Sequence, residues 1–78
     1  MKFNKEKQEY NRILDFIRGT MRRRKISQAD IAYQLGLPQG AISKRLSGKV
    51  EFSLWELVNL AEILDIEFTC KEHEEDVG

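Results

Sequence analysis

Apolar residues recur at helical spacing along most of this chain. The first set lies in the N-terminal third and comprises Tyr10, Ile13, Leu14, Ile17 and Met21. Intervals of three and four residues place such a set on one face of a helix. The pattern predicts a helix from about Asn4 or Lys5 to near Arg24.

Two shorter sets follow between residues 27 and 48. They consist of Ile31, Ala32 and Leu35, and then of Ile42 and Leu46. Ser27 stands three residues before Asp30, which favours a capped helix start. Gly36 supplies the positive φ that ends this helix, and Pro38 suits the start of the next. Two short helices joined by a tight turn form a helix-turn-helix, although an ordinary helical hairpin without a ligand has the same apolar pattern.

A fourth helix is predicted to begin after Ser53, which forms a capping box with Glu56. Its predicted inward stripe comprises Leu54, Leu57, Val58, Ala61 and Leu64, with Ile63 beside it. Trp55 and Leu60 lie off the centre of that stripe. Two interpretations remain for them: they seal the rim of the core, or they form an exposed patch for a partner.

The pattern changes its period after residue 65. Ile66, Phe68 and Cys70 alternate with polar residues, which predicts a short β-strand, and a charged end follows from His73. A lone strand needs a neighbour. The strand is therefore expected to pair with that of a second copy or to cover the core of its own chain. Residues 1–65 would then form the main domain and residues 66–78 a dimerisation element.

The exposed positions of the second motif helix, residues 38–47, differ in composition from the rest of the chain. They are Gln39, Gly40, Ser43, Lys44 and Ser47, and they include no carboxylate in a protein with thirteen acidic residues. Short or hydrogen-bonding side chains suit close approach to base edges and phosphates. This composition favours DNA binding over plain helix packing.

The segment SQADIAYQLGLPQGAISKRLSGK resembles the DNA-binding domain of the Cro and phage-repressor helix-turn-helix family. The resemblance extends from about Ile17 to Leu64. It implies an all-α, lambda-repressor-like bundle of four to five helices, and a phage or prophage regulator that binds operator DNA as a dimer. Three positions depart from the usual family pattern: Arg45 replaces an aromatic residue, Phe52 a proline and Asp65 a glycine.

The resemblance also assigns roles to individual residues. Gln28 and Gln39 match two glutamines that, in lambdoid repressors, support one another while the second pairs with an adenine. The donor and acceptor of a glutamine amide fit adenine N6 and N7. Gly40 leaves room for a thymine methyl or for close approach, Ser43 and Lys44 can reach a base edge or a phosphate, and Lys49 suits phosphate anchoring.

The net charge of zero hides a strong polarity. Residues 1–49 hold twelve Lys or Arg against four acids, whereas residues 50–78 hold one Lys against nine acids. The basic half contains the helix-turn-helix and can steer it toward phosphates. The run Arg22 to Lys25 has two explanations, because cations stabilise the end of a helix and also bind the DNA backbone.

The remaining features of the sequence argue against other classes of protein. A chain of 78 residues forms one small domain. Cys70 and His73 form a single pair where a structural zinc site needs two, and no nucleophile has a partner, so we expect no metal, cofactor, small-molecule ligand or enzymatic activity. One cysteine, no apolar run of about 20 residues and no N-terminal leader predict a cytoplasmic protein without a membrane contact.

The sequence therefore predicts a sequence-specific transcriptional regulator that reads operator half-sites in the major groove. Double-stranded DNA is its expected partner, together with a second copy held through Ile66, Phe68 and Cys70. Two alternatives stay open: an antitoxin that represses its own operon and binds a toxin, and a protein-interaction module without DNA binding.

Overall fold

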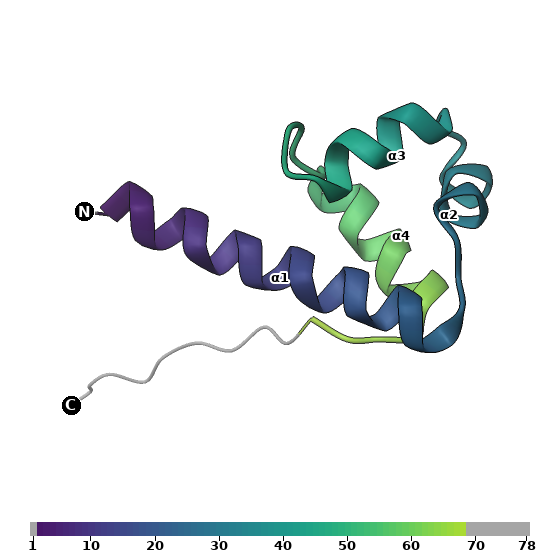
Figure 1. Ribbon diagram of the computed structural model, residues 1–78, viewed down its shortest axis with the longest axis horizontal. Helices are drawn as coiled ribbons and strands as arrows, with labels where there is room; N and C mark the ends of the chain where they lie inside the picture. Colours follow the sequence, from purple (N-terminus) through teal and green to yellow (C-terminus); the bar gives the residue numbers. More distant parts are fainter. Residues whose placement is uncertain (1, 69–78) are drawn as a thin grey trace.

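The computed structural model describes the backbone of residues 2–68 and the side chains of residues 7–68. This part of the chain forms four helices and no strand: α1 Lys2–Arg24, α2 Gln28–Leu35, α3 Gln39–Leu46 and α4 Leu54–Leu64 (Figure 1). The predicted all-α helix-turn-helix bundle is confirmed. α1 begins two to three residues earlier than the apolar pattern indicates, and Pro38 and Ser47 flank α3 as its caps rather than belonging to it.

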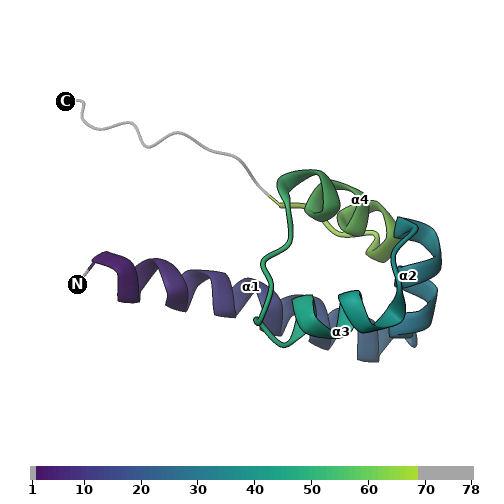
Figure 2. The same cartoon turned by 90° about the horizontal axis from the view of Figure 1, so that it is seen from above.

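The three shorter helices gather over the C-terminal half of α1, and the N-terminal half of α1 projects away from them in both views (Figures 1 and 2). α2 packs against both α3 and α4, and α4 in turn packs against α1. The second motif helix is therefore held by a compact support, which leaves its outer side open.

The core is a single apolar cluster to which all four helices contribute. Its buried members are Leu14, Ile17, Met21, Ile31, Ala32, Ile42, Leu46, Phe52, Leu60 and Leu64. The stripe predicted for α1 is confirmed, with Tyr10 and Ile13 half-buried at its outer end. Both motif sets are confirmed as well, and Ala32 is the small residue in this cluster.

The predicted inward face of α4 is wrong at two positions. Leu54 is 77% exposed and Val58 55% exposed, whereas Leu60, which was placed off the stripe, is fully buried. The helix has apolar residues at eight of its eleven positions. Several sets at spacings of three and four are therefore equally apolar, and only the packing of α4 against its neighbours selects the one that is buried. Trp55 lies outside the core and is 65% exposed.

Both predicted capping boxes are present. The Asp30 backbone N–H donates to Ser27 Oγ and the Ser27 N–H donates to the Asp30 carboxylate, each at 3.0 Å. The same pair of bonds joins Ser53 and Glu56 at 3.1 and 3.0 Å. The hydrogen bonds from Ser27 lower the pKa of the Asp30 carboxyl, so this cap is ionised at neutral pH.

A residue in the left-handed region follows each helix: Lys25, Gly36 and Asp65 come directly after α1, α2 and α4, and Gly48 comes after Ser47, the C-cap of α3. In every case the two residues at the end donate their N–H groups back into the last turn, as in a Schellman motif. Glycine adopts this conformation without strain, whereas Lys25 and Asp65, both at φ 57°, bear a cost of about 1 kcal/mol. Asp65, one of the departures from the family pattern, thus stands where glycine is favoured.

A hydrogen bond explains Phe52, the residue that replaces the proline of the family pattern. The Phe52 backbone N–H donates to the Tyr10 hydroxyl at 3.0 Å and joins the loop before α4 to α1. Proline has no N–H and could not make this bond. The Phe52 side chain is buried in the core, so this residue contributes through both its backbone and its ring.

Residues 66–68 leave α4 as an extended segment that belongs to no strand. Ile66 and Phe68 are half-buried and pack against the core of their own chain. The rest of the predicted strand, including Cys70, and the charged end from His73 lie outside the described residues.

Candidate functional site

The outer side of α3 carries most of the residues that the sequence singles out. Gln39, Gly40, Ser43 and Lys44 are all exposed, and Ser47 and Lys49 are exposed just beyond its end. The Ser47 hydroxyl donates to the Lys44 carbonyl at 3.0 Å and helps to close the helix. Unlike α2 and α4, α3 begins without a side-chain cap, because its N-cap residue is Pro38. The positive end of its dipole is therefore not neutralised by a carboxylate.

Gly40 has no packing reason to be glycine. A Cβ added there would meet no heavy atom within 4 Å. A glycine inside a helix costs about 0.5–1 kcal/mol relative to alanine. The absent side chain leaves the first turn of α3 accessible to a close ligand.

Arg45, in the last turn of α3, joins this helix to the start of α4. Its Nε donates to Glu56 Oε1 at 2.9 Å and its Nη2 to Oε2 at 3.3 Å, while Nη1 donates to the Ala41 carbonyl at 3.1 Å. The two side chains are only 18% and 13% exposed. A forked pair of this kind fixes direction as well as distance. Arg45 is therefore part of the support of α3, which explains the third departure from the family pattern.

The ion pair makes stability depend on pH. The hydrogen bonds from Arg45 lower the pKa of Glu56 below its ordinary value, against the opposing effect of burial. In the unfolded chain the pKa of a glutamate is about 4.3, and above this pH the ionised Glu56 contributes its full stabilisation to the fold. The contribution is lost as the pH falls through the lower pKa that Glu56 has in the folded protein.

We expect Glu56→Gln to lower the free energy of unfolding by about 1.5–3 kcal/mol at pH 7, with a difference that shrinks below about pH 4. Glu62→Gln is the matched control, because Glu62 is an exposed carboxylate on the same helix and should change stability by less than about 0.5 kcal/mol. Urea unfolding between pH 3 and 7 measures both differences. If the difference in the free energy of unfolding between wild type and Glu56→Gln stayed constant over this pH range, the stabilising role of the Arg45–Glu56 pair would be refuted.

A second arginine holds the C-terminal end of α3. The Arg18 guanidinium on α1 donates to the carbonyl of Leu46, the last residue of α3, and to the Asp15 carboxylate. It satisfies a carbonyl that the helix itself leaves without a partner. Arg18 and Arg45 together fix the orientation of α3 relative to α1 and α4.

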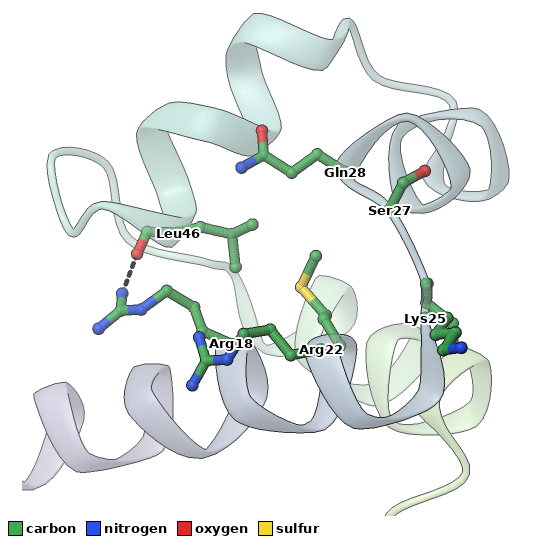
Figure 3. Close-up of a pocket in the computed structure, with 8 residues that line it drawn as sticks. Arg18, Arg22, Lys25, Ser27, Gln28 and Leu46 are labelled. Atoms are coloured by element: carbon green, nitrogen blue, oxygen red, sulfur yellow. Dashed lines mark hydrogen bonds between the residues drawn. The ribbon is translucent and has the colours of Figure 1, made fainter.

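Gln28 is the first residue of α2, whereas the other predicted residues lie on α3 or just beyond its end. It is half-buried and borders a cavity of about 420 Å³ between α1 and the helix-turn-helix. Its side chain extends over the cavity in the direction of α3 (Figure 3). The cavity is lined by Arg18, Met21, Arg22, Lys25, Ile26, Ser27, Gln28 and Leu46, a set without an acidic residue.

The roles of Arg18 and Arg45 were not predicted from the sequence. Arg45 was noted only for its departure from the family pattern. The available signal was a cation at a position where relatives have an aromatic residue, eleven residues before a glutamate fixed in a capping box. Arg18 had no such signal, because its partner is a backbone carbonyl.

In the described part of the chain, no three His, Cys, Asp or Glu side chains come together in a way that could hold a metal ion. No helix in the same range has both the length and the apolar character to cross a bilayer. Cys70 and His73, the one pair considered from the sequence, lie outside that range.

The four helices hold α3 on a fixed support and leave its carboxylate-free outer side open. This arrangement defines a helix-turn-helix DNA-binding domain. Comparison with family models supports this class: the helix-turn-helix model HTH_3 matches residues 17–69. The chain belongs to this family, the XRE or Cro/C1 type, and is a DNA-binding helix-turn-helix regulator. Searches of curated proteins and of solved structures gave no match.

Proposed function

We propose that this chain is a Cro- or repressor-type regulator that reads operator half-sites in the major groove through the exposed residues of α3. The observation that carries the proposal is the first turn of α3. It presents Gln39 and Gly40 to solvent with no carboxylate and no side-chain cap, on a helix that Arg45 and Arg18 fix at its C-terminal end. A helix directed into the groove by its N-terminus uses such residues for base contacts.

The other exposed residues take supporting roles in this proposal. Ser43 and Lys44 lie one turn further along α3 and reach a base edge or a phosphate, and Ser47 and Lys49 lie at the backbone. Gln28 binds a phosphate and supports Gln39. Phosphate contacts set the register of the protein on the duplex, whereas base contacts carry sequence information.

Selection of bound duplexes from a random DNA pool tests the proposal. We expect enrichment of one short sequence that occurs twice with its centres about 34 Å, or one helical turn, apart. If the protein bound the random DNA without enriching any sequence, base reading would be contradicted, and only attraction to the DNA backbone would remain.

A second copy of the chain completes the proposal, because one domain of this size contacts few bases. Its docking surface is proposed at the apolar groove of about 370 Å³ next to residues 66–68. The groove is lined by Ile13, Leu54, Leu57, Val58, Ala61 and Phe68. Leu54 and Val58 are largely exposed there, so the face that does not pack in the core is available for a subunit contact.

Two variants distinguish a subunit contact at this groove from a contact through the predicted strand. Val58→Lys places a charge in the groove at a half-exposed position that the fold tolerates, and a chain ending at residue 68 lacks Cys70 and the end of the strand. We expect Val58→Lys to convert the dimer to monomer in sedimentation, and the shortened chain to remain a dimer. A dimer that survives Val58→Lys but not the truncation would assign the contact to the strand. A monomeric wild type would exclude self-association, and the groove would then favour a different protein partner, as in an antitoxin.

A further inference from the structure

The segment that follows α4 runs back along α1 toward the N-terminal half of that helix. Its first residue is Asp65, whose carboxylate lies 3.7 Å from the guanidinium of Arg24 at the end of α1. Three residues later, Phe68 lines the same groove as Ile13. Arg24 and Ile13 are eleven residues apart, which is about 16 Å along a helix. Both views show the segment leaving α4 in this direction (Figures 1 and 2), so it is antiparallel to α1.

The part of α1 toward which the segment runs is apolar near the groove and basic further on. Tyr10 and Ile13 are half-buried and pack against the core. Residues 2–12 carry four cations against two acids, namely Lys2, Lys5, Lys7 and Arg12 against Glu6 and Glu9. A chain that continues beyond Phe68 in the same direction therefore meets a short apolar surface and then an excess of positive charge.

The C-terminal segment has the matching order of residues. Ile66 and Phe68 are half-buried against the core, and Glu67 between them is exposed. Successive residues of an extended chain point to opposite sides. Continued alternation places four later residues on the side of Phe68: Cys70, Glu72, Glu74 and Asp76. One apolar position is thus followed by acidic ones, in the order in which α1 changes from apolar to basic.

The segment is also long enough to cover the projecting half of α1. Ten residues follow Phe68 and lie outside the described part of the chain. Fully extended, they span at most about 33 Å, whereas the helix from Ile13 back to residue 2 measures about 16 Å. At about 3.3 Å for each extended residue, Cys70 would come level with Glu9 and Glu72 with Lys5.

We propose that residues 69–74 bind along the N-terminal half of α1 in the same copy of the chain. Cys70 lies beside Glu9, and Glu72 and Glu74 pair with the lysines of the first two turns. Of the two placements that the sequence left open, this is the one in which the segment covers its own chain. The projecting half of α1 gains a partner, and the groove on α4 stays available to a second copy. The placement is independent of DNA reading.

Disulfide formation in the full chain tests the placement. Cys70 is the only cysteine, so a variant with one added thiol has one possible intramolecular disulfide. Glu9→Cys puts this thiol one turn from Ile13 on the same side of α1, and Asn11→Cys puts it on the opposite side. Both positions are exposed. Oxidised glutathione accepts the two electrons, and electrophoresis without reductant separates the products.

We expect Glu9→Cys to form a disulfide at the mass of the monomer at least about tenfold faster than Asn11→Cys, because the bond needs Cα atoms within about 7 Å. A covalent dimer as the main product of Glu9→Cys would show that the segment binds a second copy. Equal rates for the two variants would show that it has no fixed place on α1. Either result would overturn the proposal and leave DNA reading untouched.

Charge-matched pairs of variants test the ion pairs. Glu72→Gln with Glu74→Gln removes two charges from the side of Phe68, and Glu67→Gln with Glu75→Gln removes two from the other side. We expect the first pair to speed hydrogen exchange of the amides of residues 2–12 by roughly two- to fivefold at 50 mM salt. The difference should disappear at 1 M salt, where charges are screened within about 3 Å. Equal exchange rates for the two pairs at 50 mM salt would overturn the proposal.

Discussion

Gln39→Ala is expected to abolish most of the preference for the selected site while leaving general DNA affinity in place. A glutamine that donates to and accepts from one adenine contributes about 1–3 kcal/mol of discrimination, and a dimer loses this at two half-sites. Affinity for the selected duplex should therefore fall by roughly 10- to 100-fold per half-site, and affinity for random DNA by less than about twofold. Fluorescence anisotropy with both duplexes at one salt concentration measures the two effects.

The control for this variant is Gln34→Ala, which removes another exposed glutamine from α2. It should change neither affinity, because Gln34 is outside the proposed reading face. Gln39 is exposed as well, so both variants should melt at the wild-type temperature. An equal loss on selected and random DNA would show that Gln39 does not read bases.

Leu60→Ala is expected to have the largest effect on folding. Leu60 is fully buried in the core, and leucine-to-alanine changes at such positions cost about 2–5 kcal/mol. A domain of this size has a total stability of roughly 4–12 kcal/mol, so the variant should lose a large part of it. Leu54→Ala, at a position 77% exposed on the same helix, should cost less than about 0.5 kcal/mol.

Urea unfolding at two protein concentrations measures this pair of variants. Any contribution of Leu54 to a subunit contact then appears as a concentration dependence and is separated from its contribution to the core. A larger loss for Leu54→Ala than for Leu60→Ala at low concentration would mean that α4 packs through the face that the sequence pattern indicates, and would contradict the structure.

The contrast between Leu54 and Leu60 illustrates what the sequence can predict. The ends of the helices were predictable, because Ser27, Gly36 and Ser53 act through their own neighbouring backbone. The buried face of α1 was also predictable, since polar residues surround its single apolar stripe. The apolar residues of α4 extend around most of the helix, so its orientation depends on packing against α1 and α2, which the local pattern does not contain.

The support of the candidate site was hidden for a similar reason. Arg45 and Glu56 are eleven residues apart and lie on different helices, and the bond from Arg18 reaches a backbone carbonyl 28 residues away. The exposed residues of α3 were easier to name, because they follow from the position of the motif and from the absence of carboxylates. The sequence also did not show that Arg23 bonds to the Thr20 hydroxyl and that Arg24 lies 3.7 Å from the Asp65 carboxylate.

In the proposed function, α3 reads DNA sequence from a fixed support. The most direct measurement is the ratio of wild-type affinities for the selected duplex and for a shuffled duplex of the same length and composition at physiological salt. We expect a ratio of at least about 10³, the lower end of the range for specific regulators. A ratio near one, with tight binding to both duplexes, would contradict it.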